Sequence, residues 1–224
     1  MFTTRIQAWV RRNALRVGRL LGHLPVTPNM ITVGGTLITV VAAVLAGLQY
    51  LLVAAIVLAF AGTFDILDGA LARATKKSYP YGAFLDSTMD RIAEAATYAG
   101  IAAFFLFHEP STVWYRLAIL ACICAISGSL LVSYVRARAQ SLGFTCDTGL
   151  FQRPERVVAT VVGLLLGAIW TPYALAAMAG LIAVITCITA FQRIGEVWGQ
   201  AKEQRQVARK ERAKEPHAGE RSAP

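Results

Sequence analysis

The chain has 224 residues, of which 56% are hydrophobic and 16% are charged, and it carries a net charge of +9. Soluble domains are about 45–50% apolar and about one-quarter charged, so this composition excludes an ordinary soluble domain and indicates a membrane protein. The four cysteines form no C-x-x-C pair and are too scattered for a zinc ribbon or a disulfide scaffold. Basic residues are not interleaved with aromatic residues on a soluble face, so the positive charge does not indicate nucleic-acid binding.

The N-terminal segment, residues 1–24, mixes five arginines with apolar residues such as Trp9 and Leu20. It has neither the compact apolar core nor the small-residue cleavage site of a secretory signal peptide. The pattern predicts a juxtamembrane amphipathic helix that lies in the headgroup plane, where anionic membrane lipid would hold it.

The first long uncharged run covers residues 31–64. It is too long for a single membrane span, which needs roughly 20 helical residues. The sequence Gly-Leu-Gln-Tyr at 47–50 supplies a turn in its middle. We therefore predict two helices, over about 27–47 and 51–74.

The remaining apolar segments complete an all-α arrangement. Residues 92–107 and 115–135 are each apolar enough to cross a bilayer, and the polar turn at 108–112 separates them. A second long uncharged run, 157–192, is broken at 170–173, where a proline and aromatic residues indicate a water boundary. The sequence thus predicts six transmembrane helices in one domain, residues 25–198.

The distribution of positive charge predicts the orientation of these helices. Lys and Arg collect on the cytoplasmic side of short loops, and all 22 of them except Arg116 fall on one side of the six-span arrangement. This places both termini in the cytoplasm of a multi-pass protein of the cell (plasma) membrane. The tail, residues 199–224, is charged without apolar periodicity, which is typical of solvated helix or disorder.

Four aspartates lie around one predicted cytoplasmic loop. Asp65 and Asp68 are three residues apart, and Asp86 and Asp90 are four apart, so each pair projects from one helical face. Carboxylates this close together repel one another unless divalent cations compensate them, and oxygen-only ligands suit Mg²⁺, Mn²⁺ or Ca²⁺. Because paired metal ions stabilise charge during phosphoryl displacement, these residues predict phosphotransfer at the cytoplasmic face.

Two other interpretations of the aspartates stay open on this reasoning. A juxtamembrane aspartate can be solvated, or can pair with a nearby cation such as Lys76, Lys77 or Arg91. A cation transporter would also hold carboxylates in the membrane, but near the midplane or in a ring, whereas these cluster at one edge.

The aspartates belong to a longer pattern. It reads Asp65-x-x-Asp68-Gly69-x-x-Ala72-Arg73, then eight residues, then Gly82-x-x-x-Asp86-x-x-x-Asp90. All of its fixed positions resemble the signature of the CDP-alcohol phosphotransferase (CDP-alcohol phosphatidyltransferase) family of membrane enzymes. The resemblance covers residues from about 25 to 198. It implies transfer of a phosphatidyl group from CDP-diacylglycerol to an alcohol, with release of CMP.

The resemblance also implies a role for each motif aspartate. Asp65, Asp68 and Asp86 would hold one metal ion, and Asp65, Asp86 and Asp90 a second. Both ions would be Mg²⁺, with Mn²⁺ as the alternative. Asp90 would also be the catalytic general base that takes the proton of the acceptor hydroxyl.

Two further groups of residues would bind CDP-diacylglycerol by the same resemblance. Within the motif these are Gly69, Ala72, Arg73 and Gly82. The segment Thr27-Pro28-Asn29-Met30 resembles the family's T-P-N segment beside the nucleotide. Helix capping by Thr27 or Asn29, with Pro28 in the first helical turn, explains that segment without a ligand.

Four arginines are candidates for binding the phosphate of a phosphorylated polyol acceptor, because guanidinium groups bind phosphate bidentately. They are Arg136, Arg153, Arg156 and Arg193. Each can alternatively be an ordinary positive-inside anchor.

The surrounding sequence resembles one branch of the family. Ser-Tyr-Val-Arg-Ala-Arg-Ala at 133–139, Arg-Pro-Glu-Arg at 153–156 and Phe-Gln-Arg-Ile at 191–194 resemble the branch that uses inositol 1-phosphate and makes phosphatidylinositol phosphate. Arg136 stands where many such enzymes have Lys, and Gln152 replaces a frequent acid. Archaeal members with an archaetidyl donor look similar, and glycerol 3-phosphate is the alternative acceptor. The family also implies a homodimer in a prokaryotic membrane.

Overall fold

A computed structural model describes residues 27–75, 80–108, 112–146, 148–149 and 152–214, with side chains described except those of 65–75 and 212–214. Within these ranges the chain is helical, apart from short connections. The helices are α2 (Pro28–Gly47), α3 (Leu51–Thr75), α4 (Pro80–Phe107), α5 (Val113–Ser141), α6 (Arg153–Ile169) and α7 (Pro172–Lys214). The all-α prediction is confirmed for this part of the chain, and the helix predicted for 1–24 lies outside it.

Local sequence signals explain where several helices begin and end. Thr27 caps α2 by accepting a hydrogen bond from the Met30 backbone N–H at 3.3 Å, and proline follows in the first turn. The predicted turn at 47–50 separates α2 from α3, with Gln49 in a left-handed conformation (φ 71°). At the start of α6, the Glu155 carboxylate accepts a 2.7 Å hydrogen bond from the Gln152 backbone N–H.

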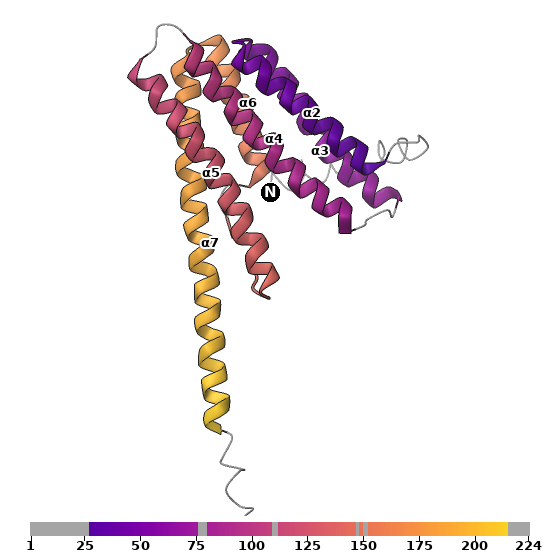
Figure 1. Ribbon diagram of the computed structural model, residues 1–224, viewed down its shortest axis with the longest axis vertical. Coiled ribbons are helices and arrows are strands. Elements are labelled where there is room, and N and C mark those ends of the chain that lie inside the picture. The colour runs from indigo at the N-terminus through magenta and orange to yellow at the C-terminus, as the bar shows by residue number, and fades with distance from the viewer. Residues whose placement is uncertain (1–26, 76–79, 109–111, 147, 150–151, 215–224) are drawn as a thin grey trace, which may run out of the picture.

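Helices that follow one another in the chain run antiparallel, whereas α4 runs parallel to α2 and α7 runs parallel to α5 (Figure 1). Helix α2 packs on α3 and α4, α5 packs on α4 and α7, and α6 packs on α3 and α7. At Gly100 the backbones of α4 and α2 approach so closely that a Cβ would lie 2.2 Å from the Ala43 carbonyl oxygen. Gly128 of α5 makes a similar contact with Thr186 of α7, where a Cβ would lie 2.6 Å from Oγ1. Small residues thus let the helices come together where larger side chains would hold them apart.

The outer surface of the bundle is apolar, as expected for contact with lipid. Leu37, Ile56 and Leu120 are all more than half exposed. Three helices, α2, α5 and α7, are long and apolar enough to cross a membrane, and a shorter apolar segment covers Leu51–Phe64 of α3. Six spans with both termini in the cytoplasm stay a prediction.

Three helices extend well beyond their predicted apolar spans. Helix α4 begins at Pro80, so that Asp86 and Asp90 lie on regular helix, and α5 continues to Ser141. Helix α7 has 43 residues and runs without a break through the predicted boundary at 199 (Figure 1). Its C-terminal part projects beyond the other helices. The apolar pattern marks only the segment of each helix that faces lipid, because polar residues continue the helix into water.

Candidate active site

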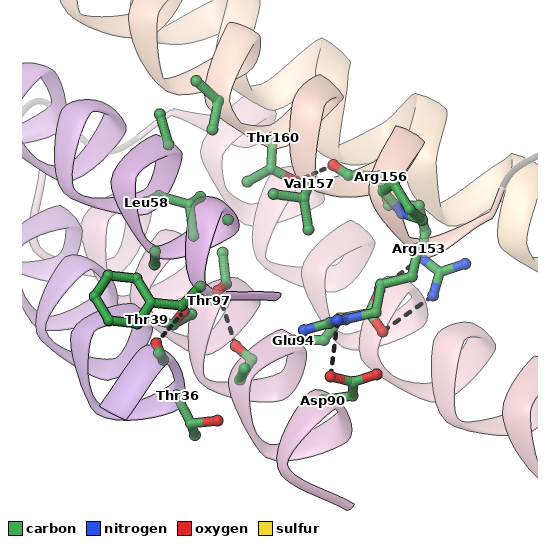
Figure 2. Close-up of a pocket in the computed structure, with 18 of the residues that line it drawn as sticks. Thr36, Thr39, Leu58, Asp90, Glu94, Thr97, Arg153, Arg156, Val157 and Thr160 are labelled. Carbon is green, nitrogen blue, oxygen red and sulfur yellow. Dashed lines mark hydrogen bonds and ion pairs between the residues drawn. The ribbon is translucent and has the colours of Figure 1, made fainter. Parts of the chain in front are cut away.

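A cavity of about 380 Å³ lies between α2, α3, α4 and α6 (Figure 2). Most of its wall is apolar or carries threonines, and Leu58, Val157, Thr39 and Thr97 are among its lining residues. Thr39 and Thr97 already hydrogen-bond within their own helices, to the carbonyl oxygens of Gly35 at 3.0 Å and Ala93 at 2.8 Å. One part of the cavity is charged, and the side chains there come from α4 and α6.

Asp90 of α4 faces the first turn of α6. Its Oδ1 atom lies 2.7 Å from Nη1 of Arg153 (Figure 2). Its Oδ2 atom lies 3.6 Å from Nη1 of Arg91. The side chain is 15% exposed. A predicted catalytic aspartate and a predicted acceptor-binding arginine, distant in sequence, are therefore in direct contact.

Glu94 and Arg156 form a second ion pair one helical turn deeper. Arg156 donates from Nε to Oε1 of Glu94 at 2.5 Å and from Nη2 to Oε2 at 3.1 Å (Figure 2). Both side chains are almost fully buried. We assigned Glu94 no role from the sequence, although its position four residues after Asp90 places it on the same face of α4.

Of the four motif aspartates, the structure describes the side chains of the two on α4. Asp86 and Asp90 lie one turn apart on α4, and both are half-buried. The side chains of Asp65 and Asp68 lie outside the described residues, although their backbone belongs to α3. The described side chains contain no group of three or more acids, histidines or cysteines close enough to hold a metal ion. The donor chemistry of the four motif positions, carboxylate oxygen only, fits Mg²⁺ or Mn²⁺.

The two predicted nucleotide-binding segments meet at the N-terminus of α2. A Cβ on Gly82 of α4 would lie 3.4 Å from Oδ1 of Asn29, so the T-P-N segment and the second half of the motif are adjacent. The Thr27 hydroxyl caps α2, as the alternative explanation of this segment predicted. Met30 is mostly exposed. The side chains of Ala72 and Arg73 lie outside the described residues, and Gly69 belongs to the same part of α3.

Arg193 lies buried at the inner end of the apolar part of α7. It donates from Nε to the Thr148 carbonyl oxygen and from Nη1 to the Val132 carbonyl oxygen, each at 2.8 Å. Arg136 of α5 and Arg156 of α6 are both near enough for their charges to repel its guanidinium. Two other predicted acceptor arginines, one on α5 and one on α6, thus lie near Arg193, and Arg153 lies one turn before Arg156. This concentration of positive charge can bind a phosphate.

A helical membrane protein in which a motif aspartate, Asp90, pairs with an arginine beside an apolar cavity has the arrangement expected of a membrane phosphotransferase. The comparison with known families agrees, because the sequence model for CDP-alcohol phosphatidyltransferase matches residues 25–192. The chain belongs to this family of transferases. The family resemblance drawn from the motif is therefore confirmed.

Characterised relatives match most of the chain. It is 35% identical over 179 residues to phosphatidylinositol phosphate synthase of Corynebacterium glutamicum, covering 80% of each protein. It is 37% identical over 194 residues to archaetidylinositol phosphate synthase of Pyrococcus horikoshii, covering 86% of this chain and 95% of that protein.

A solved structure has the same fold. The crystal structure of Mycobacterium tuberculosis phosphatidylinositol phosphate synthase with CDP-DAG bound superposes with a TM-score of 0.76 at 33% identity. The match covers 84% of this chain and 94% of that one. The same mycobacterial enzyme in complex with manganese and citrate superposes with a TM-score of 0.75.

Proposed function

We propose that the protein transfers a phosphatidyl group from CDP-diacylglycerol to inositol 1-phosphate, giving phosphatidylinositol phosphate and CMP. The observation that carries this proposal is the contact between Asp90 of the family motif and Arg153 of the arginine cluster. A phosphorylated polyol bound by the arginines would have its hydroxyl groups close to the motif aspartates. Relatives named for an inositol phosphate product support the choice of acceptor.

The aspartates carry out the chemistry in this proposal. Asp90 accepts the proton of the attacking inositol hydroxyl, and its contact with Arg153 supports this role, because a phosphate bound by Arg153 would bring the acceptor near it. Asp65, Asp68, Asp86 and Asp90 are the residues that would hold two divalent ions, Mg²⁺ or Mn²⁺. Bound there, the ions supply positive charge that stabilises the pyrophosphate and the departing CMP. The manganese complex of the mycobacterial relative supports a divalent metal.

CDP-diacylglycerol, the donor, is bound by residues at the start of α2 and by the small residues and the arginine of the motif. Asn29 and Gly82 are adjacent, and with Thr27, Pro28, Met30, Gly69, Ala72 and Arg73 they would frame the cytidine and its phosphates. The bound CDP-DAG in the mycobacterial structure supports this donor.

Arg136, Arg153, Arg156 and Arg193 form the acceptor-phosphate site. Arg136 and Arg156 both lie near enough to Arg193 to repel its guanidinium, and a bound phosphate dianion would offset this repulsion. Arg156 is held by Glu94, so within the cluster it contributes charge at a fixed position.

The setting of the enzyme is also part of the proposal. The site faces the cytoplasm of a prokaryotic plasma membrane, the chain crosses the membrane six times, and the protein forms a homodimer. The apolar exposed faces and the positive charge on one side of the spans support the membrane topology.

A second candidate donor is the archaetidyl lipid, because the Pyrococcus relative is as similar to this chain as the bacterial ones. The apolar wall of the cavity does not discriminate acyl from isoprenoid chains. Glycerol 3-phosphate is the alternative acceptor, and it would use the same arginines.

The test is CMP release by the purified protein in detergent. CDP-diacylglycerol and Mg²⁺ or Mn²⁺ are supplied with inositol 1-phosphate, free inositol or glycerol 3-phosphate. Release that requires inositol 1-phosphate supports the proposal. Release with free inositol would exclude a phosphate-binding role for the arginines, and release with glycerol 3-phosphate alone would change the acceptor. CDP-archaeol in place of CDP-diacylglycerol tests the donor.

A further inference from the structure

The connection between α5 and α6 is fastened to the part of α7 that extends beyond the predicted spans. The described residues of this connection include Thr145 and Thr148, which precede Arg153 by a few positions. Each of these threonines hydrogen-bonds to a polar side chain of α7, and neither contact could be recognised from the sequence. The family motif does not include any of these residues.

Gln200 holds one end of the connection. Its Nε2 donates to the Thr145 carbonyl oxygen at 2.7 Å, and its Oε1 accepts from the Thr145 backbone N–H at 3.1 Å. The Thr145 hydroxyl lies 3.2 Å from the same Oε1 atom. A side-chain amide that satisfies both backbone groups of one residue fixes that residue in position and in orientation.

Glu196 holds the other end. The Thr148 hydroxyl donates to Oε2 of Glu196 at 2.5 Å, while the Thr148 carbonyl oxygen accepts from Nε of Arg193 at 2.8 Å. A Cβ on Gly149 would lie 3.3 Å from Nη2 of Arg193, so the connection passes directly over this guanidinium. Thr148 is therefore held from both sides by α7.

Arg193, Glu196 and Gln200 lie three and four residues apart, which places them on one face of α7. Along this face, Arg193 and Glu196 contact Thr148, and Gln200, nearer the C-terminus of α7, contacts Thr145. The connection then leads into α6, whose first residue is Arg153. The face thus contacts the connection beside Arg193, whose own guanidinium donates to the Thr148 carbonyl oxygen.

We propose that Glu196 and Gln200 are positioning residues for the phosphorylated acceptor. By fixing Thr145 and Thr148 against α7, they hold the Thr148 carbonyl oxygen to which Arg193 donates, and so keep the Arg193 guanidinium in the position that the acceptor phosphate requires. This inference rests on the proposed function, since it assumes that the arginine cluster binds the phosphate. The two residues would act through Arg193, because the hydrogen bonds described for them go to Thr148 and Thr145.

The experiment compares Glu196→Ala, Gln200→Ala and their double variant with the unchanged protein, as full-length chains in detergent. Steady-state CMP release gives separate KM values for inositol 1-phosphate and for CDP-diacylglycerol. The double variant is expected to raise the KM for inositol 1-phosphate about tenfold, the loss that corresponds to one or two net hydrogen bonds. The KM for CDP-diacylglycerol and kcat at saturating inositol 1-phosphate should stay unchanged.

Matched controls separate positioning from a general loss of structure. Gln204 lies one turn beyond Gln200 on α7 and is exposed, and Gln204→Ala should behave like the unchanged protein. Glu196→Gln keeps an oxygen that accepts from Thr148 and should restore most of the acceptor KM. Thr148→Val combined with Glu196→Ala should be no worse than either change alone, because both remove the same hydrogen bond.

An unchanged acceptor KM in the double variant would overturn the inference, as would an equal rise in both KM values. A lower unfolding temperature of the double variant, without a larger rise in the KM for inositol 1-phosphate than in the KM for CDP-diacylglycerol, would assign the contacts a purely structural role. That result would also overturn the inference. If the unchanged protein itself releases no CMP with inositol 1-phosphate, the proposed function fails. If it does, and the variants match it, only this inference fails.

Discussion

Arg153 of α6 and Asp90 of α4 meet through a 2.7 Å contact between Nη1 and Oδ1. One belongs to the arginine cluster and the other to the family motif, so this contact joins the two halves of the proposed site. A guanidinium that binds the acceptor phosphate in this position also places the acceptor within reach of the carboxylate. Holding the acceptor hydroxyl close to the catalytic carboxylate accounts for much of the rate enhancement in enzymatic phosphoryl transfer, because the protein contributes mainly by positioning the reactants and by stabilising charge.

Replacement of Asp90 by asparagine tests its role as the general base. Asp90→Asn keeps the shape of the side chain but removes the proton acceptor. We expect CMP release to fall about 10²–10⁴-fold, which is the usual contribution of general acid–base catalysis. Binding of CDP-diacylglycerol, measured by equilibrium dialysis with radiolabelled donor, should persist. Substantial remaining turnover would exclude Asp90 as the base.

Arg153 provides the next test. Arg153→Ala should raise the KM for inositol 1-phosphate more than the KM for CDP-diacylglycerol, because the phosphate loses a bidentate partner. Arg153→Lys should restore only part of the affinity, since an ammonium is a point charge without the planar fork. The measurement is initial-rate CMP release at varied concentrations of each substrate. Arg138, exposed at the end of α5, supplies the control Arg138→Ala. Equal effects of Arg153→Ala on both substrates would contradict the acceptor site.

The sequence alone predicted the helices and the motif residues, because apolar runs and fixed spacings are local signals. The turn at 47–50 and the caps of α2 and α6 appear where the residue types require them. The partners of the arginines could not be predicted in this way. Glu94 pairs with Arg156 from 62 positions away, and Arg193 donates to carbonyl oxygens of two other segments. Such contacts depend on how the helices pack, and no spacing in one sequence reports them.

The buried pair of Glu94 and Arg156 should matter for stability. Glu94→Ala leaves the Arg156 guanidinium buried without its carboxylate, and breaking a buried pair in this way costs about 3–5 kcal/mol. The double change Glu94→Leu with Arg156→Met should cost less than Glu94→Ala, because it leaves no uncompensated charge. Thermal unfolding in detergent, followed by circular dichroism, provides the comparison. A double variant less stable than Glu94→Ala would show that the pair contributes net stability, contrary to this expectation.

Removal of divalent metal should abolish the reaction. Dialysis against EDTA is expected to stop CMP release, and addition of Mg²⁺ or Mn²⁺ should restore it, because carboxylate oxygens alone supply the predicted ligands. Asp86→Ala should increase the Mg²⁺ concentration required for half-maximal release. Full activity after chelation, checked by elemental analysis of the dialysed protein, would exclude a metal-assisted mechanism.

Among the described glycines, Gly100 leaves the least room for a Cβ, which predicts a packing defect on substitution. A Cβ on Gly100 would lie 2.2 Å from the Ala43 carbonyl oxygen, and because both atoms belong to helices, neither can move without separating α4 from α2. Overpacking of this kind costs about 1–3 kcal/mol, so Gly100→Ala should lower the unfolding temperature in detergent. Gly180 of α7 has no heavy atom within 4 Å of its Cβ position and supplies the matched control. Gly180→Ala should be neutral or stabilising, because alanine favours the helix by about 1 kcal/mol over glycine. Equal stability of the two variants would mean that α2 and α4 do not pack at this distance.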